Sequence, residues 1–446
     1  MKTALTIAGS DPTSGAGVAA DLLTFNSLGV YGFFIITALT SQTLSKVLRV
    51  QIVDGEDFSI QMKTVFENFR LNAVKTGVIS TPYQAKLIKD YVEKYNLPVI
   101  ADPVVKASDG TVFSDEETVK ELSAGLYCKA ALLTPNIIEA ERLSDHQIRK
   151  LDDIIEASYI LLKKGLKAVL IKGGHLNSSK EVFDVLNTGE EIKIFKKPRR
   201  EWLKIHGTGC VLSAAIAAYT AQGYSITEAV MRGEEYFSKL AAYPLNLNNS
   251  VGVLQPSKIL NDCVEKIEGI RELNQAAYFL DKVLEAGRLD ALGEFALLYS
   301  INKPVDVGDV VFLKLFKESE GETLKLSYPT IGSDDFTSRI MLTVKKWLPS
   351  IRACLCLPYS EKLTRNLEES SEFNHIKIFF KNLTFNQLNL LEETLRKILC
   401  TETKCTVDFI ILFIDKNPVK IMVLGESSFD SIYKLAKVLK KEVKKL

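Results

Sequence analysis

The stretch from Ile205 to Gly223 of this 446-residue chain, IHGTGCVLSAAIAAYTAQG, contains the first group of candidate functional residues. Two glycines flank a threonine, a cysteine follows, and an alanine-rich apolar segment begins at once, which predicts a tight loop opening onto a buried helix. The amides of Gly207, Thr208 and Gly209 could then face one concavity at the helix N-terminus, where the helix dipole favours negative charge. The stretch therefore predicts an anion site, with a glycine turn that only packs the helix as the alternative.

Cys210 follows this loop directly. A helix N-terminus lowers the pKa of a thiol, so this side chain could help to remove a proton from an acceptor hydroxyl; a buried structural cysteine is the other interpretation. The chain contains no G-x-x-x-x-G-K-[ST] motif, which leaves the glycine loop as the candidate phosphate cradle. The neighbouring His206 is expected to cap or pack rather than to act as a base.

A second group of candidate residues follows three other apolar runs. The stretch LLTPNIIEAERL places Asn136 and Glu139 three residues apart at a predicted turn from strand to helix, so both side chains share one face. Such oxygen ligands suit Mg²⁺ held largely through water and phosphates, and a helix cap with a first-turn acid is the alternative. Asp102 in ADPVV is a further candidate or an ordinary turn residue. The glycine pair of IKGGH could let the backbone approach a nucleotide or could only turn the chain.

A third stretch, TIAGSDPTSGAGVAADL, has Gly15, Gly17 and Ala20 in the spacing of a dinucleotide fingerprint. In that fingerprint the glycines lie at the end of a strand, and an acid ends the next strand about 20 residues on. Here SDPTS intervenes and the next apolar run ends in TALTSQT without an acid, which argues against NAD binding. A glycine-rich substrate loop and a purely structural turn remain as alternatives.

The elements between these motifs must bring them together. From residue 1 to about 256, short runs rich in β-branched residues, such as ALTIAG, GFFIITAL and KAVLIKGG, alternate with longer amphipathic segments. This alternation predicts an α/β fold with a mostly parallel sheet and helices on both faces. Because the polar, glycine-rich signals follow the runs, we expect them around one cleft at the carboxyl ends of the strands. Helices are expected over residues 17–28, 82–95, 152–164 and 209–219.

A second domain is predicted after this one. Residues 241–258, AAYPLNLNNSVGVLQPSK, lose helical periodicity and are dense in Pro, Asn, Ser and Gly, which indicates a boundary. Beyond it, runs such as DVVFLKLF, RACLCLPY and VDFIILFI mix less regularly with helical segments, which predicts a C-terminal α+β domain. We therefore expect one domain over residues 1–258 and another over residues 265–446.

The composition excludes several classes of protein. Basic and acidic residues number 56 and 55, so no general attraction draws the chain to nucleic acid or to an anionic membrane. The basic end KLAKVLKKEVKKL is expected to be a solvated helix face. The seven cysteines lack the spacing of a disulfide framework or a zinc site, which favours a reducing, cytoplasmic compartment. No apolar run reaches the roughly 18 residues of a membrane span.

Six motifs in the expected order, from residue 2 to about 256, resemble the hydroxymethylpyrimidine and hydroxymethylpyrimidine-phosphate kinases of thiamine biosynthesis, members of the ribokinase-like superfamily. They are AGSDPTSGAGVAADLLTFNSLGVYGFFIITALTSQT, KTGVIS, ADPVV, LTPNIIEAERL, IKGGH and HGTGCVLSAAIAA. The resemblance implies ATP- and Mg²⁺-dependent phosphorylation of 4-amino-5-hydroxymethyl-2-methylpyrimidine and then of its monophosphate. It also implies a homodimer without a nucleic-acid or membrane partner. A noncatalytic binder of a thiamine precursor is the rival, and the phosphate and magnesium motifs argue against it.

The resemblance also implies roles for individual residues. The pyrimidine is expected beside an apolar wall and an amide that can donate and accept, in a set made of Gly9, Asp21, Gln42 and Val78. ATP and its magnesium are expected across the cleft, with ATP near Asn136, Lys172 and Gly173 and the metal near Asn136, Glu139 and Asp102. Catalysis is assigned to Gly207, Thr208, Gly209 and Cys210, whose loop would stabilise the transferred phosphoryl group.

Cys210 stands where many relatives in the superfamily carry an aspartate. A fixed carboxylate would repel an acceptor that is already phosphorylated, whereas a thiol can be neutral or ionised. We therefore expect the cysteine to suit an enzyme that phosphorylates both an alcohol and its phosphate.

Residues 268–440 resemble, less strongly, the archaeal-type thiamine-phosphate synthase domain, through NKPVDVGDVVFL, YPTIGSDDFTSRIML and SIRACLCLPYS. That domain joins the pyrimidine diphosphate to a thiazole phosphate and releases pyrophosphate. The chain departs from the pattern, because Phe336 replaces a histidine, Pro358 replaces the arginine before Tyr359, and IDKNPVK lacks an aspartate–glycine pair. The loss of cationic groups weakens the case for catalysis. A catalytic domain, a sensor using Arg339 and Arg352, and a structural or oligomerising module all remain open.

Overall fold

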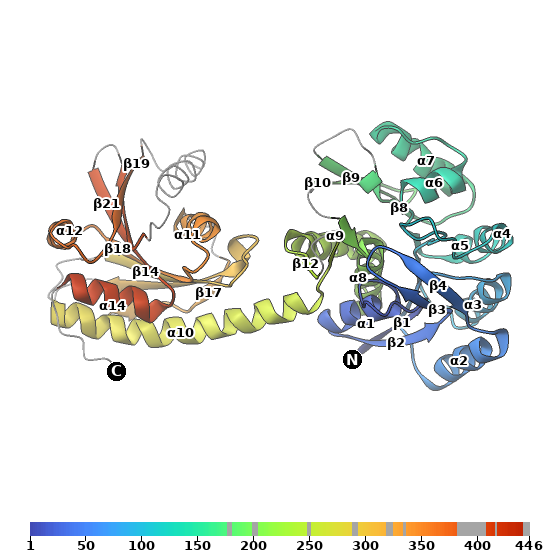
Figure 1. Cartoon of the computed structure of the whole chain (residues 1–446), viewed down its shortest axis with the longest axis horizontal. Helices are drawn as coiled ribbons and strands as arrows, with labels where there is room; N and C mark the ends of the chain where they lie inside the picture. The colour runs from blue at the N-terminus through green and yellow to red at the C-terminus, as the bar shows by residue number, and fades with distance from the viewer. Residues whose placement is uncertain are drawn as a thin grey trace. The chain divides into compact units, whose positions relative to one another are not determined.

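The computed structural model describes residues 1–175, 181–198, 204–247, 251–287, 293–317, 324–332, 336–380, 407–414 and 417–439. The chain divides into two compact units, Met1–Leu260 and Asn261–Leu446, each with its own sheet and hydrophobic core (Figure 1). Within the described ranges, no helix is long and apolar enough to cross a membrane.

The first unit is built on a sheet with the strand order β10-β9-β8-β7-β6-β5-β1-β2. Neighbouring strands from β2 to β8 pair in parallel, and β9 and β10 add an antiparallel edge. The predicted α/β fold with a mostly parallel sheet is therefore confirmed. The strands are β1 (Lys2–Ala8), β2 (Val30–Ile36), β5 (Ala73–Thr76), β6 (Val99–Ala101), β7 (Leu132–Leu133), β8 (Val169–Ile171), β9 (Glu181–Asn187) and β10 (Ile192–Pro198).

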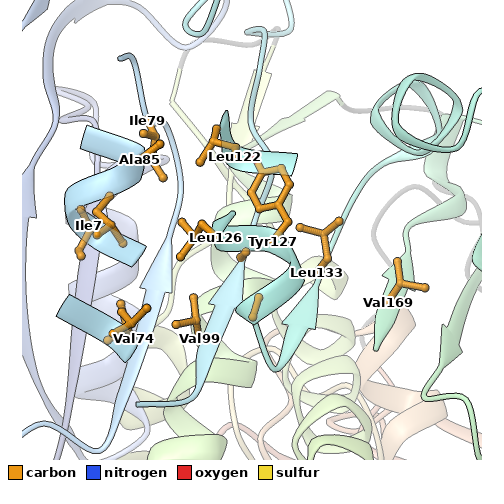
Figure 2. Packing of buried hydrophobic residues seen from close by; sticks show 14 of the residues in the cluster. Ile7, Val74, Ile79, Ala85, Val99, Leu122, Leu126, Tyr127, Leu133 and Val169 are labelled. Atoms are coloured by element: carbon orange, nitrogen blue, oxygen red, sulfur yellow. The ribbon is translucent and has the colours of Figure 1, made fainter. Parts of the chain in front are cut away.

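Helices cover both faces of this sheet because successive side chains of a buried strand point to opposite sides. On β1, Leu5 packs in one cluster with side chains of α2, α3, α6 and α7, and Ala4 packs in another with α1, α8 and α9. Figure 2 shows part of the first cluster, with strand residues Ile7, Val74, Val99, Leu133 and Val169 labelled. The helices are α1 (Gly17–Ser27), α2 (Gly55–Asn68), α3 (Pro82–Lys94), α4 (Glu116–Ala124), α5 (Leu126–Lys129), α6 (Ile137–Ser144), α7 (Leu151–Lys163), α8 (Thr208–Gln222) and α9 (Ile226–Ala242).

Two segments of the first unit differ from the expectation. The run GFFIITAL is not one strand: it breaks at the buried Thr37, and β3 (Ala38–Gln42) pairs with β4 (Val47–Ile52) in a separate antiparallel hairpin. The expected boundary over residues 241–258 is partly ordered. There, β12 (Leu245–Asn246) and β13 (Val251–Val253) form a small sheet with β11 (Lys204–His206). Val251 and Val253 are buried, so part of this polar segment belongs to the core of the first unit.

The second unit has the predicted α+β character. Its sheet has the order β16-β15-β14-β18-β21-β20-β19 and is antiparallel except between β19 and β20. Side chains of α10, α12 and α14 pack on one face, and side chains of α11 pack on the other. Sequence reasoning missed the central strand β14 and helix α12. The elements are α10 (Ser257–Gly287), β14 (Gly293–Ser300), β15 (Val310–Lys317), β16 (Lys325–Leu326), β17 (Thr330–Ile331), α11 (Phe336–Trp347), β18 (Ala353–Pro358), α12 (Glu361–Glu368), β19 (His375–Phe380), β20 (Phe409–Ile414), β21 (Asn417–Gly425) and α14 (Ser428–Val438).

Candidate functional site

The carboxyl ends of the parallel strands in the first unit surround a cavity of about 290 Å³. Its walls come from the loops after β1, β5, β6, β7 and β8, from the β3–β4 hairpin and from the start of α8. Strand ends are where ligands bind in sheets of this kind. The predicted site residues that line the cavity are Gly9, Gln42, Val78, Asp102, Asn136, Glu139, Lys172, Gly207, Thr208, Gly209 and Cys210. Asp21 and Gly173 do not line it.

Two glycine-rich loops meet backbone to backbone at one side of the cavity. Gly207 has φ +75°, and a Cβ atom there would lie 1.7 Å from the carbonyl oxygen of Gly15. A side chain at residue 207 is therefore excluded by contact as well as by backbone conformation. α8 begins directly after Gly207 without a side-chain cap, and its first residues, Thr208 and Gly209, line the cavity. An uncapped helix N-terminus at a cavity leaves backbone amides without partners in the helix, and anions commonly bind at such ends.

A carboxylate and a histidine hold the two loops together. Asp11 Oδ2 lies 2.8 Å from His206 Nε2 and also accepts from the amide of Ala16, while Oδ1 accepts from the amide and hydroxyl of Thr13. Burial alone would raise the pKa of Asp11, but hydrogen bonds from His206, Gln42 and Thr13 outweigh it and lower the pKa. His206 thus packs and bonds as expected. Asp11 was missed, although an aspartate two residues before a threonine in a loop is a common turn signal.

Asp21 lies beneath the cavity rather than in its wall. Its carboxylate is fully buried and accepts from Lys75 Nζ at 2.7 Å and from the Thr6 hydroxyl at 2.6 Å. Lys75, which does line the cavity, is a second residue that sequence reasoning missed. Burial alone would lower the pKa of Lys75, but the charge of Asp21 and other nearby anionic groups raise it, so the ammonium form persists. The signal was a lysine inside the four-residue buried strand AVKT.

The expected activation of Cys210 is not found in this structure. Burial raises the pKa of its thiol to about 11, and the lowering influence of Lys75 does not compensate. The prediction of a lowered thiol pKa considered only the helix N-terminus, and it is wrong because desolvation of the thiolate is the larger effect here. At neutral pH the thiol is therefore protonated.

Lysine and carboxylate groups lie next to the start of α8, where a Cβ atom on Gly209 would lie 3.0 Å from Lys172 Nζ and 3.4 Å from Asp102 Oδ2. Lys172 Nζ lies 2.7 Å from Asp102 Oδ1, which also accepts from the Thr134 hydroxyl at 3.1 Å. Asn136 and Glu139 form a capping box at the start of α6, so the helix-cap interpretation of this pair is realised. Both residues nevertheless line the cavity.

The charge at this end of the cavity suits a cation. Burial, aided by the charge of Asp102, raises the pKa of Glu139 to about 7. A bound cation would relieve that excess of negative charge. In the described ranges no three His, Cys, Asp or Glu side chains converge as a metal site. A magnesium ion here would therefore depend on one or two carboxylates together with phosphates and water, as Mg²⁺ commonly does.

Comparison with known proteins identifies the first unit. Residues 11–255 match the phosphomethylpyrimidine kinase family. The chain belongs to this family. A hydroxymethylpyrimidine/phosphomethylpyrimidine kinase of Staphylococcus aureus (strain MSSA476) is 36% identical over 253 residues, which cover 56% of this chain and 92% of that protein. The bifunctional thiamine biosynthesis protein ThiDN of Methanocaldococcus jannaschii is 29% identical over 373 residues and covers 82% of each chain.

Solved structures agree with the ribokinase-like fold of this phosphomethylpyrimidine kinase family member. The Bacillus subtilis pyridoxal kinase in its ADP complex has a TM-score of 0.54 and 30% identity, covering 58% of this chain and 99% of that one. The Staphylococcus aureus pyridoxal kinase with AMP-PCP and pyridoxal has a TM-score of 0.53 and 29% identity, and the match covers 57% of this chain and 93% of that one.

Replacing Gly207 by alanine is expected to lower kcat at least about 100-fold. The new methyl group would force the loops at Gly15 and Gly207 apart, and the amides at the start of α8 would no longer point at the phosphoryl group. The matched control is Gly223→Ala at the end of α8. Gly223 also has a positive φ of +101°, but a Cβ atom there meets nothing within 4 Å. This control is expected to cost about 1 kcal/mol in stability and to keep kcat. Steady-state kinetics and thermal unfolding of both variants test this; equal kcat losses would contradict it.

Proposed function

We propose that the chain is an ATP- and Mg²⁺-dependent kinase of 4-amino-5-hydroxymethyl-2-methylpyrimidine and of its monophosphate, in thiamine biosynthesis. The observation that carries the proposal is that members of both predicted sets line one cavity: Gly9, Gln42 and Val78 from the pyrimidine set, and Asn136, Glu139 and Lys172 from the nucleotide and metal set. The names of the relatives support the same activity. The nucleotide complexes of the pyridoxal kinases support ATP as the donor.

In this proposal the glycine loop contributes the phosphoryl site. The amides of Gly207, Thr208 and Gly209 donate to the transferred group, and the Lys172 ammonium adds positive charge beside it.

Other residues of the cavity bind the pyrimidine and the metal. Val78 and Gly9 form an apolar wall for the pyrimidine ring, and the Gln42 amide forms hydrogen bonds with the polar edge of the ring. Asp102, Glu139 and Asn136 would hold Mg²⁺, which neutralises phosphate charge in reactions of this kind. Asp21 acts indirectly, because it holds Lys75 at the cavity floor.

Cys210 supports the second phosphorylation because its thiol is neutral at physiological pH. A monophosphate acceptor carries up to two negative charges near neutrality, and a neutral side chain does not repel it. The acceptor oxygen of a phosphate monoester is also largely deprotonated, so this step needs little help from a base.

Cys210→Asp is expected to lower kcat/KM for the monophosphate at least about tenfold more than kcat/KM for the alcohol, because a carboxylate repels the charged acceptor. Cys210→Ser is the matched neutral control and should affect the two acceptors by similar factors. Initial rates with each acceptor at saturating Mg-ATP provide the measurement. Full activity of Cys210→Asp on the monophosphate would contradict this proposed role of the cysteine.

We also infer how the chain divides into domains. Residues 1–258 form the kinase domain, and residues 265–446 form a divergent thiamine-phosphate synthase-like domain. The coverage of ThiDN from Methanocaldococcus jannaschii supports a fusion of this kind. Arg352, one candidate for a sensor site, is already engaged: it donates to the Tyr299 hydroxyl and lies 3.4 Å from Glu265. Arg339 lies in α11. The side chain of Phe336, residues 415 and 416 of IDKNPVK, and the last residues of the basic segment, 440–446, lie outside the described residues.

We further propose a cytoplasmic homodimer. The edge strand β2 exposes Tyr31 and Phe34, which are 54% and 48% accessible, and Leu48 of the neighbouring hairpin is 66% accessible. Large apolar side chains that are exposed on an edge strand and a hairpin are typical of a surface that another subunit covers. Sedimentation at micromolar concentration should give the mass of two chains, and a single-chain mass would contradict the proposal.

One incubation tests the proposed function directly. Purified protein is mixed with hydroxymethylpyrimidine, Mg-ATP and thiazole phosphate, and the products are identified by mass spectrometry. Pyrimidine diphosphate without thiamine monophosphate is expected, which indicates an active kinase with a second domain that has lost synthesis. Abundant thiamine monophosphate would make the chain bifunctional, and the absence of any phosphorylated pyrimidine would favour a noncatalytic binder.

A further inference from the structure

A buried charged group lies outside the cavity, between the antiparallel edge of the sheet and α9. Lys197 Nζ on β10 lies 2.6 Å from Asp184 Oδ2 on β9 and 2.5 Å from Glu234 Oε2 on α9. The three side chains are 14%, 4% and 5% exposed. The ring of Phe237, one turn along α9, lies 4.9 Å from the same ammonium. Nothing in the proposed mechanism uses these charges.

The group is connected to the cavity through one backbone amide. Asp184 Oδ1 accepts from the buried amide of Gly173 at 2.8 Å. The same glycine is pressed against β9, because a Cβ atom there would lie 2.1 Å from the carbonyl oxygen of Phe183. Its neighbours in sequence, Lys172 and Gly174, both line the cavity. The position of this short loop is therefore set by Asp184, and the position of Asp184 is set by Lys197 and Glu234.

The charges in the group do not balance if both acids are ionised. Two carboxylates would then share one ammonium away from water, which is costly. Glu234 Oε1 has no hydrogen-bond partner, a further cost for an ionised group. Burial, and then the charge of Asp184, raise the pKa of Glu234 to about 8. Near neutrality Glu234 therefore keeps its proton, and the group has no net charge.

No other charged side chain is placed to restore this balance among the described neighbours. α8, which packs against α9, has the sequence TGCVLSAAIAAYTAQ and carries no charged residue. On the strands, Lys196 pairs with Glu181 and Lys193 pairs with Glu191. On α9, Glu235 pairs with Lys239, and Arg232 stacks on Tyr224. Among the side chains that the structure describes, Asp184 and Lys197 are the charged groups that face Glu234 directly.

We propose that Asp184, Lys197 and Glu234 are positioning residues that fix the Lys172–Gly174 loop for nucleotide binding, and that loss of the proton on Glu234 weakens ATP binding at alkaline pH. The inference rests on the proposed kinase function and adds residues to its nucleotide side. When Glu234 loses its proton, the group gains a negative charge close to the Lys172–Gly174 loop, where the proposal places the phosphates of ATP. The added charge repels these phosphates, and the altered ion pairs no longer fix the loop. Both changes weaken the binding of ATP rather than that of the pyrimidine.

The first test is Lys197→Met, which leaves Asp184 without its cation. The expected result is a KM for ATP raised about tenfold, the size typical of losing a partner that orients a ligating group, with the KM for the pyrimidine within twofold. Lys197→Arg should recover part of the loss. The matched control is Glu235→Gln, one residue from Glu234 but 68% exposed, which should match the wild type. An unchanged KM for ATP in a folded Lys197→Met protein would overturn the proposal.

A second test does not depend on Lys197→Met folding. In the wild type and in Glu235→Gln, the KM for ATP is expected to rise several-fold between pH 7 and pH 9, as Glu234 loses its proton. Glu234→Gln keeps a neutral side chain of the same shape and should remove that rise. If Glu234→Gln shows the same rise as the wild type, the inference fails. Phosphorylation of the pyrimidine by the wild type at pH 7 separately tests the kinase function, so the two failures are distinguishable.

Discussion

The rest of the site depends on the direct backbone contact between the loops at Gly15 and Gly207. With 1.7 Å between a hypothetical Cβ atom and a carbonyl oxygen, only glycine fits at residue 207. The contact places the start of α8, and with it the helix N-terminus, against the loop that follows β1. The Asp11–His206 pair then holds the two loops in that position. A phosphoryl group and an acceptor can thus meet in one cavity although their loops are about 190 residues apart in sequence.

Buried pairs of opposite charge set the electrostatics around that contact. Lys75 with Asp21 forms the floor, and Lys172 with Asp102 lies on the proposed nucleotide side. Each lysine ammonium is paired with an aspartate carboxylate. The cavity can therefore bind anionic ligands, and no buried ammonium is left without a carboxylate partner when the ligand is absent. The protonated thiol of Cys210 fits this arrangement, because it adds no negative charge where a phosphorylated acceptor must enter.

The sequence predicted local features well and long-range ones poorly. Glycine spacing and the apolar run after Cys210 were enough to predict α8 and its loop, since both are properties of neighbouring residues. The burial of Asp21 was not predictable, because its partner Lys75 lies 54 residues away. The pKa of Cys210 depends on the desolvation of a whole cavity wall, which a helix-terminus rule omits. The break in GFFIITAL is fixed at Thr37, whose amide bonds to the carbonyl oxygen of Ala8 on another strand.

A crystal structure with Mg-AMP-PCP, which keeps a γ-phosphate that cannot be transferred, and hydroxymethylpyrimidine would test the central claim, that one cavity brings the phosphoryl donor and the pyrimidine to the glycine loop. The account predicts a terminal phosphate at the amides of Gly207, Thr208 and Gly209, with the pyrimidine ring against Val78 and within hydrogen-bond distance of Gln42. Phosphates bound away from these amides, or a pyrimidine outside this cavity, would contradict it.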